Sequence, residues 1–96
     1  MKLSLTAFAA LLPFSALTKA WIFTVPTQQF DGDNNFSCTP IYVAKGEIID
    51  FQVGILESCV IRVYNDAQCD VQIGISSRDW THTLGRPMFA FDIQDC

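Results

Sequence analysis

Histidine is almost absent from this sequence, and that scarcity argues against most acid–base chemistry. His82 is the only histidine; it stands between two threonines, and no Gly-x-Ser-x-Gly motif accompanies it. General acid–base and nucleophilic catalysis need a second titrating or nucleophilic group held beside such a residue. We therefore expect His82 to be a surface or half-buried loop histidine, and the protein not to be an enzyme.

Metal-binding patterns are also missing. No Cys-x-x-Cys pair occurs, which together with the single histidine argues against a zinc site. Asp31, Asp33 and Asn35 have the spacing of a calcium loop, but Phe36 and Tyr42 stand where that loop requires glycine and glutamate. We expect a solvated acidic loop here, with no metal and no cofactor.

No apolar run is long enough to cross a membrane as a helix, which takes about 20 residues. The longest run, residues 3–12, follows Lys2 and precedes the small residues Thr18 and Ala20. A basic start, a short apolar run and small residues at −3 and −1 are typical of a secretory signal peptide. We predict a signal peptide over 1–20, cleavage before Trp21, and a secreted, extracellular single domain over 21–96. The alternative is a buried N-terminal helix.

Basic residues are few once residues 1–20 are removed. Four remain against ten acidic residues, so the net charge of 21–96 is −6. Nucleic acids and anionic membranes both attract clustered lysine and arginine. We expect a monomer that binds neither nucleic acid nor membranes, and whose partner is a protein that the sequence does not identify.

Cysteine, by contrast, is plentiful for a chain of this size. An even number of cysteines in a short exported domain predicts disulfides. Two bridges would each stabilise a small core by about 3–4 kcal/mol. The cysteines, all in the predicted mature domain, are Cys38, Cys59, Cys69 and Cys96.

Alternating apolar residues predict a three-stranded meander over 48–55, 59–64 and 69–75. The register that keeps apolar residues together pairs Val63 with Cys69 and Cys59 with Ile73. The face expected to be buried then carries Ile49, Phe51, Val53, Ile55, Cys59, Ile61, Val63, Cys69, Val71, Ile73 and Ile75. Arg62, Tyr64, Asp70 and Gln72 should point the other way.

The register also narrows the disulfide pairing. It places Cys59 and Cys69 about 13 Å apart, whereas a disulfide needs Cα atoms within about 7 Å. A Greek-key return of the last strand beside 59–64 would bring Cys96 to Cys59. This favours 59–96 with 38–69, and leaves 38–59 with 69–96 open.

The remaining segments complete an all-β prediction: a small, disulfide-stapled antiparallel sandwich or Greek-key domain. Residues 21–25 should form an edge strand and 40–44 a short one, with long loops at 27–39 and 76–87. Within the second loop, 80–83 could be a short strand. In the last strand, 88–96, the residues expected to face inward are Phe89, Phe91 and Ile93.

The two long loops hold the candidate interaction residues. The loop aromatics Phe30, Phe36 and Trp80 either close the ends of a small core or contact a partner. Arg78, Trp80 and Arg86 are the predicted partner contacts, because arginine and tryptophan dominate binding hot spots. Asn35-Phe36-Ser37 is a glycosylation sequon; exposure of the loop favours its use, and the nearness of Cys38 opposes it.

These features together resemble the small secreted cysteine-containing proteins of filamentous fungi, many of which are candidate effectors in virulence. Cys59-Val-Ile-Arg-Val-Tyr-Asn-Asp-Ala-Gln-Cys69, with the closing Phe91-Asp-Ile-Gln-Asp-Cys96, is similar to secreted Greek-key proteins of βγ-crystallin type. The crystallin pattern has a glycine after its tyrosine corner, but this chain has Asp70-Val71 at that place. The chain also lacks the paired-serine calcium motif. No calcium ligands are therefore carried over.

Phe36-Ser37-Cys38 is similar to the aromatic-x-Cys signature of some mildew and rust effectors. The ribonuclease-like fold of some of those proteins needs a helix that this sequence does not predict. The resemblance implies a non-catalytic, effector-like binding protein acting on a host or extracellular protein. The alternatives are a toxin or antimicrobial protein of killer-toxin type and, less favoured, a small ribonuclease-like enzyme.

Overall fold

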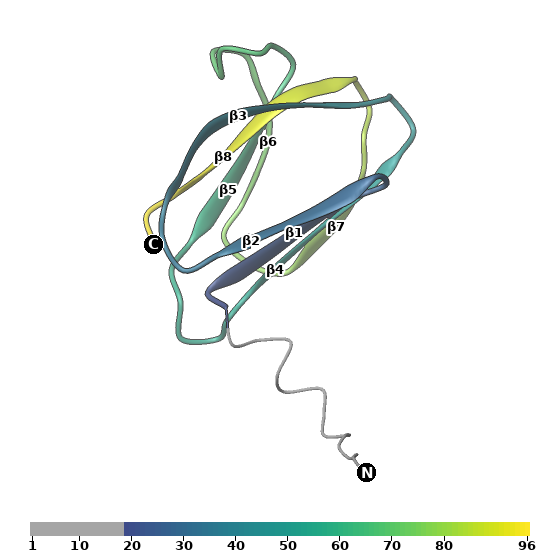
Figure 1. Cartoon of the computed structure of the whole chain (residues 1–96). Helices are drawn as coiled ribbons and strands as arrows, with labels where there is room; N and C mark the ends of the chain where they lie inside the picture. The colour runs from purple at the N-terminus through teal and green to yellow at the C-terminus, as the bar shows by residue number, and fades with distance from the viewer. Residues whose placement is uncertain (1–18) are drawn as a thin grey trace, which may run out of the picture.

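The computed structural model describes residues 19–96. All but the last two residues of the predicted signal peptide lie outside that range. The described chain forms eight strands in two facing antiparallel sheets, with no helix, which confirms the predicted all-β class (Figure 1). The strands are β1 (Trp21–Val25), β2 (Gln28–Gly32), β3 (Phe36–Val43), β4 (Ile48–Val53), β5 (Val60–Tyr64), β6 (Gln72–Ser76), β7 (Trp80–Thr83) and β8 (Met88–Gln94).

The first sheet has the strand order β2-β1-β4-β7 and the second has the order β3-β8-β5-β6. The consecutive strands β2 and β3 are therefore edge strands of different sheets, and so are β6 and β7. We call the side between β2 and β3 the closed flank, because phenylalanine side chains of the two strands pack on each other there. We call the side between β6 and β7 the open flank, because a groove lies there. The last strand, β8, lies between β3 and β5, as the Greek-key prediction required.

Alternation along the strands builds the core. In β1 the side chains of Trp21, Phe23 and Val25 are buried, while the two between them are only half-buried. Successive side chains of a strand point to opposite faces, so a two-residue apolar period fills one face. Phe23 meets Phe91 of the opposite sheet at 4.7 Å between ring centroids, which joins the two layers.

The hairpin of β5 and β6 exists as predicted, but its predicted register is wrong. Val63 lies opposite Gly74 and not Cys69. The Asp66 carboxylate accepts hydrogen bonds from the backbone amides of Gln68, Asp70 and Val71, which holds 65–71 as a loop outside the ladder. As a consequence Val71 is half exposed, as is Ile75, and neither has the buried position expected for it.

The predicted three-stranded meander is also wrong, because β4 pairs with β1 and β7 in the other sheet. The Gly54 amide donates to the Ala20 carbonyl at 3.0 Å, and the Glu57 amide donates to the Gly54 carbonyl at 2.9 Å. These bonds turn the chain off the end of β4 and towards the second sheet. Ile55, expected inside, lies on this turn and is 97% exposed.

Three further segments differ from expectation. Strand β1 is internal, paired with both β2 and β4, and the predicted loop 27–39 contains β2 and the beginning of β3. Residues 80–83 do form a short strand. At the start of β8, Met88 and Ala90 are buried and Phe89 packs outward against Tyr42, because the β3–β8 register shifts there.

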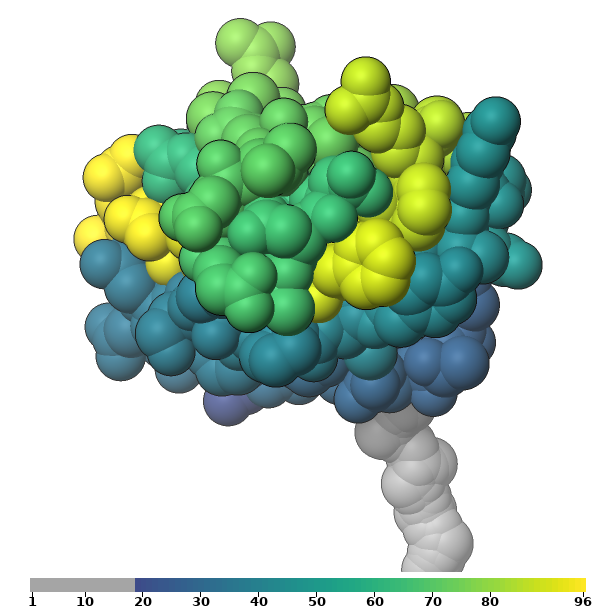
Figure 2. All heavy atoms as spheres, turned by 90° about the horizontal axis from the view of Figure 1, so that it is seen from above, coloured from purple at the N-terminus to yellow at the C-terminus, as the bar shows by residue number. Residues whose placement is uncertain are grey.

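The disulfides are Cys38–Cys69 and Cys59–Cys96, which confirms the favoured pairing and excludes the alternative. Asp95 has a φ of 59°, and this left-handed residue turns Cys96 back from the end of β8 to reach Cys59. The other bridge holds the loop 65–71 over the outer face of the second sheet. Figure 2 shows this segment, in green, standing above that face.

Under that loop lies a small polar cluster. Asp92 is only 5% exposed, and its Oδ2 accepts hydrogen bonds from the Tyr64 hydroxyl and the Gln94 side-chain amide, each at 3.1 Å. Burial, together with the hydrogen bond to Asp92, raises the pKa of Tyr64 above its ordinary value. Tyr64 lies on the face opposite Ile61 and Val63, as predicted, but it is buried there beside Asp92.

Candidate binding sites

The three predicted partner contacts do not form one surface. Arg78 precedes β7 and Arg86 follows it, and the two exposed side chains line different grooves. Trp80, at the start of β7, is half-buried and packs against the core. A common patch of the three residues is therefore not present.

Trp80 has a packing role that the sequence did not show. A Cβ on Gly74 would lie 2.8 Å from the Trp80 ring, so the absence of a side chain on β6 is what admits the indole. The Trp80 ring also stacks on the His82 ring, with 4.7 Å between the ring centroids. Phe30 and Phe36 also pack on the core, so closure of the core is the role that the structure supports for all three aromatics.

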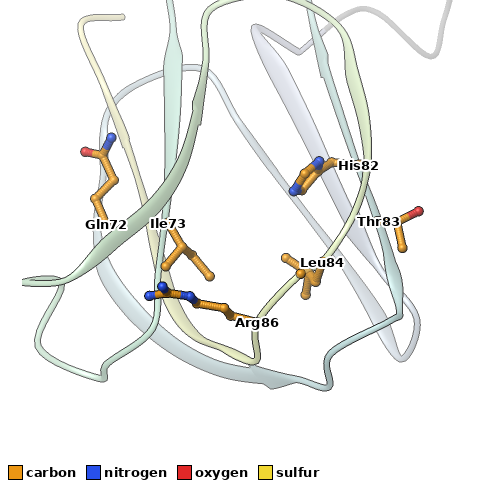
Figure 3. Close-up of a pocket in the computed structure, with 7 residues that line it drawn as sticks. Gln72, Ile73, His82, Thr83, Leu84 and Arg86 are labelled. Carbon is orange, nitrogen blue, oxygen red and sulfur yellow. The ribbon is translucent and has the colours of Figure 1, made fainter.

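A groove of about 530 Å³ opens between β6 and β7 on the open flank; we call it the edge groove (Figure 3). Its floor is apolar: Leu84 is buried, and Ile73 is half-buried against the core. The His82 ring points into the groove, and the Arg86 side chain extends across it towards Ile73, whereas Thr83 points away. The full lining is Gln72, Ile73, His82, Thr83, Leu84, Gly85 and Arg86, with no carboxylate among them.

Local structure fixes this arrangement. His82 lies opposite Ile49 of β4, so strand alternation turns its ring inward and leaves Thr81 and Thr83 exposed. The Leu84 amide donates to the Glu47 carbonyl at 2.9 Å, and its carbonyl accepts from an amide at 2.8 Å. That second donor is Gly46, whose φ of 90° suits glycine. The groove wall is thus held by backbone bonds.

A second candidate surface lies at the end of the sandwich where β4 passes to β5. Two adjacent aliphatic side chains on this turn, Ile55 and Leu56, are 97% and 93% exposed. Beside them a groove of about 320 Å³ includes Arg78 and Asp79 in its lining. The Asp79 carboxylate accepts from the Val53 amide at 2.9 Å, which fixes the turn that carries Arg78 beside this end of β4. We call residues 54–58 the Ile55 loop.

Sequence reasoning placed a connection at 56–58 but misplaced Ile55, because Ile55 continues the alternation of β4 past the end of the strand. The available signal was the sequence around it, Gly54 before the pair and Glu57-Ser58 after it, which is typical of a turn. A strand that ends at Gly54 would have placed both aliphatic residues outside.

The acidic segment has hydrogen-bonding roles. Asp33 accepts from the Ala20 amide at 3.1 Å, and the exposed Asn35 accepts from the Cys96 amide at 3.0 Å. No group of three or more potential metal-binding side chains occurs among residues 19–96. Glycosylation of Asn35 stays a prediction; its side-chain oxygen, and not the nitrogen that would carry the glycan, makes the bond to Cys96.

Two findings bear on the compartment. Both disulfides are formed, which is typical of an oxidising, extracellular-type environment. In the part of the chain that the structure describes, no helix has the length and apolar character needed to cross a membrane.

Comparison of the chain with protein-family models, with curated proteins and with solved structures found no match. The edge groove and the Ile55 loop are therefore interpreted from their own residues.

Proposed function

We propose that this protein is a secreted, effector-like binding protein that acts on a host or extracellular protein by contact and not by catalysis. The observation that carries the proposal is the Ile55 loop, where Ile55 and Leu56 are 97% and 93% exposed. Burying one such side chain in a partner is favourable by about 1.5–3 kcal/mol. Two adjacent ones on a turn next to Arg78 supply an apolar anchor and an arginine, both common in interfaces.

The location of this loop suits recognition. It lies at one end of the sandwich, at the bottom of Figure 1, and both of its ends are fixed: Gly54 bonds to Ala20, and Cys59 is bridged to Cys96. Loops on a rigid scaffold are frequent carriers of binding. A fixed loop also loses less conformational entropy on binding than a free one.

Secretion is part of the same proposal. The signal-peptide features of residues 1–20 and the two disulfides support export into an oxidising compartment. The fungal origin and the role in virulence rest on the resemblance to small secreted cysteine-containing fungal proteins.

Binding is favoured over chemistry by the surroundings of His82. Its ring stacks on Trp80, and no carboxylate lines the groove into which it points. Acid–base hydrolysis of the ribonuclease kind requires a second titrating group within hydrogen-bond reach of the reacting atoms. Arg86 supplies charge at this groove but does not supply that proton-transferring partner.

A photo-cross-linking experiment tests the proposal. A cross-linking amino acid is placed at Leu56 and, in a matched control, at the exposed Thr27 on the β1–β2 turn at the other end of β1. We expect one discrete extracellular partner to be captured from Leu56 and not from Thr27. Capture should be lost in the Ile55→Ser variant and retained in His82→Ala, both with unchanged far-UV circular dichroism.

Equal capture from both positions would contradict the proposal. So would turnover of a substrate by the wild type that disappears in a folded His82→Ala variant, because that result would make the protein an enzyme.

A further inference from the structure

The edge groove has a composition that is unusual for this molecule. The predicted mature chain carries ten acidic residues against four basic ones, yet none of the acids lines this groove. Its polar side chains that reach inward are an arginine and a histidine, Arg86 and His82 (Figure 3). The groove lining thus carries a positive charge in a protein that is negative as a whole.

Neither inward polar group is paired with an acid in the part of the chain that the structure describes. No ion pair within 4.0 Å is formed by Arg86 or His82 among residues 19–96. A guanidinium presents a planar fork of donors that matches the two oxygens of a carboxylate, or those of a phosphate, bidentately. Arg86 therefore offers an unused oxyanion-binding group at the mouth of the groove.

The floor of the groove adds a second requirement. Ile73 and Leu84 present apolar surface below the two polar groups, and the volume of about 530 Å³ is within the range of small-molecule sites, about 300–1,000 Å³. A bare inorganic anion would leave this apolar floor in contact with water. A ligand with an oxyanion head and an apolar body would use both parts of the groove.

We infer that the edge groove binds a small organic anion, a carboxylate or a phosphate monoester on an apolar ring or chain. Arg86 receives the oxyanion, His82 donates a further hydrogen bond, and the apolar body lies over Ile73 and Leu84. This site is separate from the Ile55 loop, which contains neither residue, so it does not depend on the proposed protein partner.

The test is a titration of the ¹⁵N-labelled protein followed by NMR, with four probes. Benzoate and phenyl phosphate carry both parts of the expected ligand, acetate lacks the apolar body, and benzyl alcohol lacks the charge. We expect saturable shifts at the amides of 72–73 and 82–86 with benzoate or phenyl phosphate, and at least tenfold weaker binding of acetate and of benzyl alcohol. Whichever of the two complete probes binds more tightly identifies the head group.

Two arginine variants separate this site from general attraction of anions. Arg86→Gln should weaken binding about tenfold or more, since it removes a charge-assisted hydrogen bond. Arg78→Gln is the matched control, because Arg78 is also exposed but lies at the other end of β7; it should leave the affinity unchanged.

The inference would be overturned by the absence of any saturable shift, by shifts that centre on Arg78, by equal binding of benzyl alcohol, or by unchanged affinity in Arg86→Gln. Both arginine side chains are exposed, so neither variant should affect folding, which the dispersion of the amide spectrum checks directly.

Discussion

The two flanks of the sandwich are built from the same kind of strand connection and end in different structures. On the closed flank, Phe30 of β2 and Phe36 of β3 both pack on Phe91, with ring centroids at 4.9 and 5.7 Å. On the open flank, Trp80 of β7 is the one aromatic side chain that packs on the core, and its neighbour on β6 is Gly74. The phenylalanine cluster fills the first flank at the start of β3 and leaves a groove of about 190 Å³ beside the end of β3, whereas the second flank retains a groove of about 530 Å³.

The difference shows that side-chain volume at the edge strands decides whether a small sandwich carries a groove. Protein interiors pack as densely as organic crystals, so a position without a side chain must be filled by a neighbour or left open. Trp80 fills the space above Gly74 but does not reach the level of Leu84 and Arg86. The binding site proposed here is the remaining space.

The largest effect is expected from breaking the closed flank. Phe91 is fully buried and contacts Phe23, Phe30 and Phe36, so Phe91→Ala should cost about 3–5 kcal/mol of unfolding free energy through lost burial and a cavity. Urea denaturation measures the change. Phe89→Ala, two residues away and 38% exposed, should cost clearly less; equal losses would show that the aromatic cluster is not what closes this flank.

The next largest effect on stability is expected from a substitution on the open flank. In Gly74→Ala the new methyl group would lie within 3 Å of both Trp80 and Val63, which should cost about 1–3 kcal/mol by overpacking. Gly85→Ala is the matched control, since a methyl group there meets no atom within 4 Å, and its effect should stay within about 0.5 kcal/mol. Displacement of Trp80 would also appear as a shift in tryptophan fluorescence, and an unchanged spectrum with unchanged stability would contradict this account of the flank.

The polar cluster under the loop 65–71 gives a pH-dependent comparison. Because the pKa of Tyr64 is raised in the folded state, the unfolded state loses this proton first, and stability should fall as pH rises above about 10. Tyr64→Phe should cost about 1 kcal/mol at pH 7 through the lost bond to Asp92, and should make the alkaline decline shallower.

Tyr42→Phe is the control for that prediction, because Tyr42 is 60% exposed and its hydroxyl has no partner among residues 19–96. Urea titrations at neutral and alkaline pH measure both variants. An alkaline decline of the same steepness in Tyr64→Phe as in the wild type would disprove the assignment to Tyr64.

The sequence predicted those features that local patterns determine. Alternation predicted the all-β class and the buried positions of Ile61 and Val63, and the Greek-key return predicted the bridge from Cys59 to Cys96. The absence of a Cys59–Cys69 bridge was also predicted correctly, although the register used to argue it was wrong.

What the sequence could not predict depends on contacts between distant segments. A turn such as 54–58 looks the same whether the next strand joins the same sheet or crosses to the other one. The shift of the hairpin register follows from the Asp66 carboxylate and from the bridge between Cys38 and Cys69. Trp80 could not be assigned to the core before Gly74 was known to lie beneath it.

At the candidate site, too, the position of the residues depends on contacts between distant segments. The sequence analysis named the arginines of the loop 76–87 together, but β7 separates them, so that Arg78 lies beside the Ile55 loop and Arg86 lies in the edge groove. The groove itself joins β6 to the segment after β7, a contact that no spacing in the sequence specifies.

The smallest effect is expected at Gln72, on the rim of the open flank. Its side chain is exposed, points away from the groove in Figure 3, and makes no hydrogen bond within the described chain. Gln72→Ala should therefore change the unfolding free energy by no more than about 0.5 kcal/mol and leave benzoate binding unaltered, whereas Arg86→Gln should weaken benzoate binding about tenfold or more at equal stability. Urea denaturation and the NMR titration together measure this pair. A loss above about 1 kcal/mol in Gln72→Ala would mean that the rim helps to hold β6 against β7, and that the open flank is closed more firmly than its few aromatic contacts indicate.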